Sequence, residues 1–287
     1  MALASLAATP EPATKTCQDS LRAPCRERYP SPYRALTRLG LPSSDTMRST
    51  SSTLADVPCR AWYDRRVAVV SDLEGTLTTG ETWRALGREA ALRIGRGRYL
   101  AFAARRLPGM AWVMAGRGSK RAFQDAWLEG LARCFAGADE AEFEAAAVRA
   151  VDAELWPKRR HDVIAALRVH LASGEPLVIA SGSLEPLVTA FARRLGEATG
   201  RPVQALGTPL EVAGGRLTGR IAGRISTGDV KAQRVHELLG SERLAVAYGD
   251  TGADVPLLLL ADAPVAVYPD EALRRTASEL GWTVLDG

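Results

Sequence analysis

The chain has 287 residues, of which 46% are hydrophobic, enough to form the core of one large or two modest globular domains. Its formal net charge is only +4 at pH 7, and its arginines are scattered along the chain with Asp and Glu interleaved. Aromatic residues make up 6% of the chain, too few for the stacking surface that sequence-independent nucleic-acid binding requires. We therefore expect a globular protein with no nucleic-acid partner.

The cysteines and the apolar runs predict a cytoplasmic protein without a membrane anchor. No two cysteines form a Cys-x-x-Cys pair, and no cluster of histidines lies near one, so neither a zinc site nor a disulfide framework is expected. The longest apolar run, residues 256–267, is interrupted by Asp262 and is shorter than the roughly 20 residues that span a bilayer. The first residues also lack the basic start and unbroken apolar stretch of a secretory signal.

Residues 1–60 are rich in Ser, Thr, Pro and Arg and show no sustained period of 2 or 3.6. This composition is typical of a disordered or loose extension. Met47 precedes the first convincing strand by a short distance. Translation from Met47 is therefore an open alternative to translation from Met1.

From Val67 onward, short apolar runs alternate with helical patterns, which predicts a doubly wound, mostly parallel α/β sheet. The first run, VAVVS at 67–71, has the β-branched character of a buried parallel strand. The segment around Gly214 and Gly215 differs, because two extended pieces there flank a good hairpin turn. The other expected strands are 177–180, 203–206, 244–248, 265–267 and 283–285, and the clearest helices between them are 161–172, 185–195 and 231–239.

Between the first strand and about residue 156, the sequence favours helices, for example over 81–94 and 119–135. An insert of this size at this place suits a small helical cap over the strand ends. We therefore expect a catalytic core formed by residues 67–78 and 157–287 and a helical cap formed by residues 79–156.

Polar residues follow several of the apolar runs, at the carboxyl ends where open α/β sheets bind ligands. Taken singly, an Asp there is commonly a helix cap, a Ser a turn residue and a Lys a solvated group. Together they supply what phosphoryl transfer needs: a nucleophile, a proton donor, oxygen ligands for Mg²⁺ and groups that hold phosphate oxygens. The candidates are Asp72 and Glu74 in DLEGT, Ser181-Gly182, Lys231, and Asp250 and Asp254 in GDTGAD.

These motifs, in this order and with an insert after the first, resemble the haloacid dehalogenase (HAD) superfamily, in particular its phosphoserine-phosphatase-like branch, subfamily IB. The resemblance covers about residues 67 to 287. It implies a magnesium-dependent phosphatase that hydrolyses a small phosphomonoester through a phosphorylated Asp72. It also implies a complete set of site residues: Asp72, the Glu74 carbonyl and Asp250 on Mg²⁺, Asp254 supporting the metal shell, Glu74 as acid and base, and Thr76, Ser181, Gly182 and Lys231 on the phosphate.

One position departs from the family pattern, because the second acid of the first motif is usually Asp and is Glu74 here. The extra methylene shifts the carboxyl group by about an ångström, enough to alter the rate. Some relatives with Glu at this position resemble phosphotransferases, so transfer of the phosphoryl group to a second alcohol stays open. A catalytically inactive phosphate-binding relative also stays open.

The cap should select the substrate. Glu81 falls where phosphoserine phosphatases carry a glutamate for the substrate amine, and it is equally well explained as an acid at a helix start. The arginine that those enzymes direct at the substrate carboxylate has no counterpart in residues 123–128, which counts against phosphoserine. We expect a small phosphorylated metabolite, with lipid or protein phosphates as the alternative, and a receiver-type signalling domain is disfavoured by the cap-sized insert.

Overall fold

The computed structural model describes residues 67–286, so the expectations for residues 1–60 and for Met47 lie outside the described part of the chain. Its main element is a six-stranded sheet in the order β3-β2-β1-β6-β7-β8, in which every neighbouring pair is parallel. This arrangement confirms the expected doubly wound α/β fold. The strands are β1 (Val67–Ser71), β2 (Leu177–Leu184), β3 (Val203–Thr208), β6 (Arg243–Gly249), β7 (Ala263–Val267) and β8 (Thr283–Leu285).

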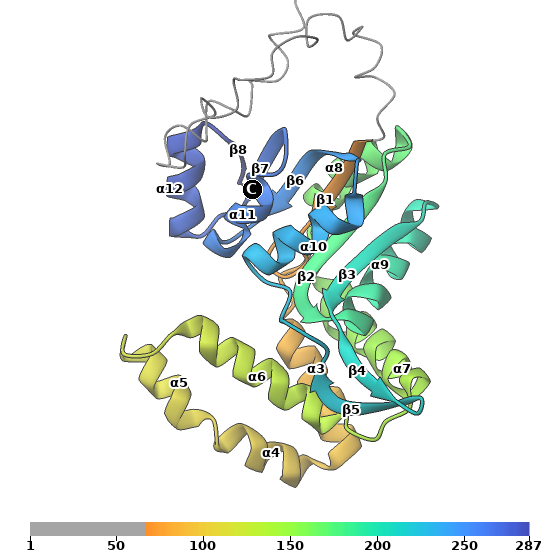
Figure 1. Cartoon of the computed structure of the whole chain (residues 1–287), viewed down its shortest axis with the longest axis vertical. Helices are drawn as coiled ribbons and strands as arrows, with labels where there is room; N and C mark the ends of the chain where they lie inside the picture. The colour runs from red at the N-terminus through yellow and green to blue at the C-terminus, as the bar shows by residue number, and fades with distance from the viewer. Residues whose placement is uncertain (1–66, 287) are drawn as a thin grey trace, which may run out of the picture.

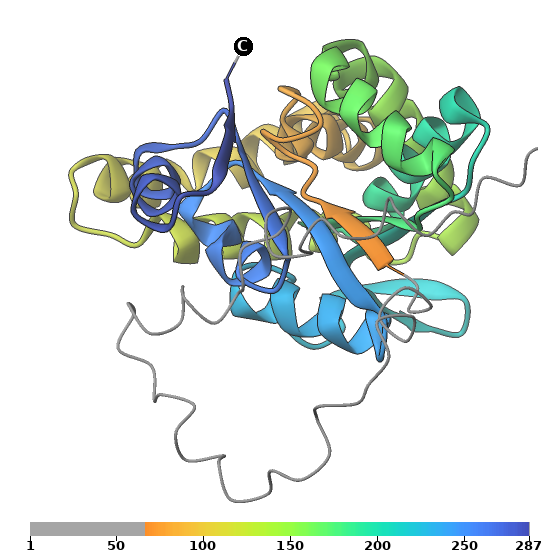
Figure 2. The same cartoon turned by 90° about the horizontal axis from the view of Figure 1, so that it is seen from above.

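The central strand β1 is buried on both faces, which explains its continuous apolar sequence. Because successive side chains of a strand point to opposite faces, Val69 packs on one face and Ala68 and Val70 pack on the other. The first face is covered by α8 (His161–Ala172) and α9 (Glu185–Thr199), and the second by α10 (Asp229–Leu239), α11 (Val255–Leu258) and α12 (Glu271–Leu280). Figure 2 shows β1 and β6 between these helical layers.

The chain between β1 and α8 is helical and forms a layer beyond the end of the sheet, below it in Figure 1. This is the segment in which the sequence predicts a cap. Its elements are α3 (Thr82–Ile94), α4 (Arg96–Ala104), α5 (Leu107–Met114), α6 (Lys120–Cys134), α7 (Glu140–Ala150), the π-helical turn η2 (Val151–Leu155) and the 3-10 turn η3 (Trp156–Lys158).

The predicted hairpin is present as the antiparallel pair β4 (Leu210–Ala213) and β5 (Arg216–Ile221), with Gly214 and Gly215 in the turn. It does not join the main sheet. Instead, Leu217 exchanges backbone hydrogen bonds with Gly137 and Ala138, directly after α6, at 2.8 and 2.9 Å. The hairpin therefore extends the helical layer, although its residues come from the second half of the chain.

One strand differs from the sequence-based expectation. Strand β2 continues to Leu184 instead of ending at Ala180, and its pairing with β3 becomes irregular between those two residues. The segment after Asp250 forms the 3-10 turn η4 (Gly252–Asp254). Among residues 67–286, no helix combines the length and the apolar character needed to cross a membrane.

Candidate active site

Asp72 lies at the carboxyl end of β1 and is held by a buried lysine. Lys231 Nζ donates to Asp72 Oδ1 at 2.6 Å and to Asp254 Oδ1 at 2.7 Å. All three residues are buried, with exposed fractions of 5% or less. Lys231 comes from the first turn of α10 and Asp254 from the end of η4, so three distant segments meet at one end of the sheet. One cation thus bridges two buried carboxylates.

Local structure fixes the Asp254 carboxylate. Its Oδ2 atom accepts the backbone N–H of Thr251 at 3.2 Å and the Thr251 hydroxyl at 3.1 Å. The first of these bonds, together with the Asp254 backbone N–H donated to the Thr251 side chain, forms a capping box for η4. Burial alone would raise the pKa of Asp254, but the charge and hydrogen bond of Lys231 lower it below its usual range. Asp254 is therefore ionised and points back toward the loop that carries Asp250.

Asp250 completes an acidic cluster with Asp72 and Asp254. One carboxylate oxygen from each residue can be chosen such that all three lie within 4.8 Å of one another. Burial, added to repulsion within the cluster, raises the pKa of Asp72 to about 7 and that of Asp250 to about 8. In this site burial and repulsion oppose the ionisation of the carboxylates, and their oxygens are hard donors. Both properties fit a divalent cation such as Mg²⁺.

Gly75 permits the close approach of the two acidic loops. Its φ of 88° lies in the region that favours glycine. A Cβ atom there would lie 1.9 Å from Asp250 Oδ2, far inside contact distance. Any larger residue at this position would therefore displace the Asp250 carboxylate.

Glu74 is anchored at the start of α3. Its Oε2 atom accepts the backbone N–H of Thr82 at 2.8 Å and also accepts the Thr82 hydroxyl. Burial raises the pKa of Glu74, the two Thr82 hydrogen bonds oppose this rise, and the charge of Glu81 adds to it. The carboxyl group is thus oriented by the helical layer, with a pKa moved toward the range in which it can both donate and accept a proton.

The remaining predicted phosphate-binding residues lie around this cluster. The Thr76 hydroxyl donates to Asp250 Oδ1 at 3.3 Å, and buried Ser181 accepts the backbone N–H of Ser183 at 3.2 Å. Ser181 lies within β2 instead of after it, because the strand continues. The Gly182 carbonyl accepts the Thr208 hydroxyl at 2.7 Å, so a hydrogen bond from β3 stabilises this end of β2.

Two buried hydroxyls near Gly182 have no hydrogen-bond partner among the described residues, namely those of Ser183 and Thr227. Thr227 packs so closely on Gly182 that a Cβ on the glycine would lie 2.3 Å from the threonine methyl group. A buried hydroxyl without a partner is costly, so a ligand with acceptor oxygens is a natural partner for both groups. Neither residue was predicted from the sequence.

Glu81 directly precedes α3 and is partly exposed. Its carboxylate pairs with Arg84 at 2.9 Å, and the two side chains are 41% and 55% exposed. The charge of Glu81 acts on Glu74, so Glu81 lies near the rim of the site. This geometry suits both interpretations of Glu81, the substrate-binding acid and the acid at a helix start.

Two further residues, Thr82 and Arg160, position the loop after β1 and were not predicted from the sequence. Arg160 donates from Nε to the Gly75 carbonyl at 2.9 Å, and its guanidinium lies 3.8 Å from the centre of the Tyr268 ring. Its backbone N–H also donates to the Leu77 carbonyl at 2.8 Å. No local pattern could reveal this role, because Arg160 and Gly75 are 85 residues apart.

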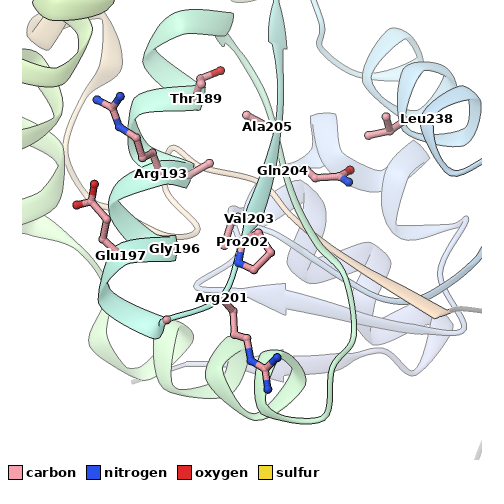
Figure 3. Close-up of a pocket in the computed structure, with 12 residues that line it drawn as sticks. Thr189, Arg193, Gly196, Glu197, Arg201, Pro202, Val203, Gln204, Ala205 and Leu238 are labelled. Carbon is pink, nitrogen blue, oxygen red and sulfur yellow. The ribbon is translucent and has the colours of Figure 1, made fainter.

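A surface hollow elsewhere on the molecule is lined by α9 and by the start of β3 (Figure 3). Thr189, Arg193 and Gln204 are among the residues that line it. None of the candidate site residues does so. Because β3 is parallel to β1, the start of β3 lies toward the opposite end of the sheet from the acidic cluster.

Comparison with known proteins agrees with this geometry. The family model for haloacid dehalogenase-like hydrolases matches residues 69–259. The phosphoserine phosphatase SerB1 of Mycobacterium tuberculosis is 39% identical over 123 residues, which cover 42% of this chain and 38% of SerB1. A probable phosphatase of the same organism is 37% identical over 128 residues, 43% of this chain and 42% of that protein. The chain thus matches less than half the length of these curated relatives.

Solved structures show the same fold. A protein of unknown function from Bordetella pertussis Tohama I superposes with a TM-score of 0.63 at 27% identity, over 77% of this chain and 99% of that one. A phosphoserine phosphatase in the form of a phospho-aspartyl intermediate analogue gives a TM-score of 0.51 at 18% identity, over 78% and 94% of the two chains. The second likeness concerns the fold alone.

The parallel sheet and the family match define the class of protein: this chain belongs to the haloacid dehalogenase-like hydrolases. The resemblance seen in its motifs is thereby confirmed, and the chain is a member of an enzyme family.

Proposed function

We propose that this protein is a magnesium-dependent phosphatase that hydrolyses a small phosphomonoester through an aspartyl-phosphate formed on Asp72. The observation that carries the proposal is the buried contact of Asp72 with Lys231, beside Asp250 and at the carboxyl end of the central strand. This arrangement puts a nucleophile, a cation and a set of metal-binding oxygens in one place.

Asp72, Asp250 and the backbone carbonyl of Glu74 would hold Mg²⁺, with Asp254 supporting the site through Lys231. When bound, the ion supplies positive charge that offsets repulsion between the anionic nucleophile and the anionic ester. Lys231 contributes to the same end from the protein side, because its hydrogen bond favours the ionised form of Asp72. The Asp72 carboxylate then attacks phosphorus, and the bond to the leaving oxygen breaks.

Glu74 would act first as acid and then as base. In its protonated form it gives its proton to the departing alkoxide, which leaves as the alcohol. The resulting carboxylate takes a proton from water, the water oxygen attacks phosphorus, and the carboxylate of Asp72 is released with inorganic phosphate. The raised pKa of Glu74 and its fixed position against Thr82 support both steps.

The phosphate oxygens would be held by Thr76, Ser181, Gly182 and Lys231. The unpartnered hydroxyls of Ser183 and Thr227 support this assignment, because they lie beside Gly182. The helical layer beyond the sheet end would limit access to compact substrates. We therefore propose a small metabolite as the substrate, and we leave phosphoserine, suggested by the name of SerB1, as one ester among those to be tested.

The experiment is a phosphate-release assay on a panel of small phosphomonoesters, with Mg²⁺ or with EDTA. We expect metal-dependent turnover that Asp72→Asn abolishes. Asp152→Asn, the same substitution at an exposed position, is the matched control and should leave turnover unaffected. Unchanged turnover in Asp72→Asn would remove the proposed nucleophile. Adding an acceptor alcohol tests the phosphotransferase alternative. Formation of a new phosphorylated product would show that the reaction is transfer to the alcohol and not hydrolysis.

A further inference from the structure

A cationic stretch without any acid lies in the helical layer. Between Glu89 and Asp125 the chain contains eight Arg and Lys residues and no Asp or Glu. This departs from the interleaved charges found along the chain as a whole. The stretch includes all of α4 and α5 and the first turns of α6. Its charge is therefore concentrated on one part of the fold.

The same stretch exposes large apolar side chains. Neither α4 nor α5 has a buried residue. Leu107, Met110 and Met114, at spacings of three and four, share one face of α5 and are 55%, 42% and 80% exposed. Trp112 at 56% and Leu100 at 64% add to the patch. A monomeric soluble protein rarely exposes so many large apolar residues on adjacent elements.

The basic side chains around this patch are available for a partner. Within the described residues, none of the five basic side chains that are included in the surface defined below forms an ion pair. Arg93 and Arg121 differ, because they pair with Glu142 and Asp125. We define the α4–α5 surface by its apolar residues Leu100, Leu107, Met110, Trp112 and Met114 and its basic residues Arg96, Arg98, Arg105, Arg117 and Lys120.

Three kinds of occupant can be compared by their chemistry. A second copy of the chain would bring two such positive surfaces face to face in a symmetric contact, which like-charge repulsion opposes. Nucleic acid would require stacking aromatics, and Trp112 is the one aromatic residue of the surface. Exposed aliphatic and thioether side chains surrounded by arginine match the acyl and headgroup layers of an anionic bilayer.

We propose that the α4–α5 surface docks this protein on anionic phospholipid membranes. The apolar side chains of α5 enter the boundary between headgroups and acyl chains, and the surrounding Arg and Lys residues contact the lipid phosphates. Such a contact is peripheral, so it requires no membrane-spanning helix. The proposal does not depend on the reaction assigned to the acidic site, because the surface shares no residue with it.

The test is flotation of the full-length protein with vesicles of phosphatidylcholine alone or of phosphatidylcholine mixed with phosphatidylglycerol. We expect binding to the anionic vesicles only, weakened by added salt because of charge screening. The double variant Met110→Glu and Met114→Glu should bind about tenfold less, because two apolar contacts are lost and two negative charges are added. Val169→Glu is the matched control, since Val169 is 66% exposed on α8 in the catalytic core and should bind like the parent.

Retained turnover of a soluble phosphomonoester, or failing that an unchanged melting temperature, shows that the double variant is folded. Equal binding of the double variant and the parent would overturn the proposal, as would equal binding to neutral and anionic vesicles. An absence of binding to either vesicle would also overturn it. Dimerisation or retention on nucleic acid that is lost in the double variant, without vesicle binding, would assign the surface to one of the other occupants.

Discussion

At the scale of single residues, the site depends on how closely its loops approach. Gly75→Ala should abolish phosphatase activity, because the new methyl group would displace Asp250. Gly174→Ala is the matched control: its φ is also positive, 81°, but nothing lies within 4 Å of the added Cβ. We expect both variants to lose about 1 to 2 kcal/mol through backbone strain, and only Gly75→Ala to lose turnover. Equal activity in the two variants would show that the Gly75 contact is unimportant.

Lys231 is the second residue whose role can be isolated. Lys231→Met leaves the buried carboxylates of Asp72 and Asp254 without their shared cation, so we expect a loss of about 3 to 5 kcal/mol in unfolding free energy. Arg274→Met, which removes an exposed pair with Asp286, should change little. Denaturant unfolding in EDTA near neutral pH measures both. Comparable effects of the two substitutions would contradict the proposed electrostatic role.

The pH dependence of the Lys231 effect has a defined sign. Lys231 keeps the pKa of Asp254 below its ordinary value of 3.8, so the stability that this carboxylate contributes is present above that pH. It is lost as the pH falls through the lowered pKa. The deficit of Lys231→Met should therefore narrow in strong acid, where Asp254 is protonated in the folded and unfolded states.

At the scale of elements, α3 links the helical layer to the chemistry through Thr82. Thr82→Val removes one hydrogen bond that lowers the pKa of Glu74, so this pKa should rise further. The steps that need ionised Glu74 should then shift to higher pH. We expect the acidic limb of the kcat profile to move to higher pH in Thr82→Val. It should return to its position in the parent in Thr82→Ser, which keeps the hydroxyl.

The profile is best measured from about pH 5 to about pH 9 with a phosphoester whose leaving group needs no protonation. In the proposed mechanism, hydrolysis of the aspartyl-phosphate is the step for which Glu74 must be ionised, and this step then dominates the acidic limb. A uniform loss of kcat with no shift of that limb would mean that Thr82 only supports the fold.

The sequence predicted the elements whose signal is local. The apolar run 67–71 and the Gly214-Gly215 turn identify β1 and the hairpin directly. The extension of β2 through Ser181 was missed, because Ser and Gly usually end a strand and only pairing with β3 shows otherwise. The roles of Thr82 and Arg160 were missed for a related reason: both depend on contacts across the fold with Glu74 and Gly75.

At the scale of the whole molecule, the parallel sheet brings several carboxylates together at one end. Their burial and mutual repulsion there lower the stability of the folded protein. The loops after β1 and β6 bring Asp72 and Asp250 into one cluster, because the carboxyl ends of these two parallel strands lie at the same end of the sheet. The raised pKa values of both residues mean that ionising them disfavours the folded state. The free energy of unfolding is thus coupled to pH through this cluster, and under the proposed function it is also coupled to Mg²⁺.

This coupling makes opposite predictions for Asp250→Asn with and without metal. The pKa of Asp250 rises from 3.8 to about 8 on folding, so the carboxyl group lowers stability progressively as the pH increases across that window. Without metal, Asn should therefore stabilise the protein near pH 8, by about 1 to 2 kcal/mol and about 2 to 8 °C. This advantage should shrink toward pH 4, where Asp250 is protonated in the folded state and increasingly in the unfolded state.

With Mg²⁺ the order should reverse, because the ion stabilises the parent by binding its ionised carboxylates and Asn removes one of them. The melting-temperature gain from Mg²⁺ should also grow with pH in the parent, since protons compete for Asp72 and Asp250. Thermal unfolding of both proteins in EDTA and in Mg²⁺ at several pH values measures all of these effects. If Asn destabilised the metal-free protein near pH 8, Asp250 would be a structural residue and not a group that the fold retains, at a cost in stability, for its metal.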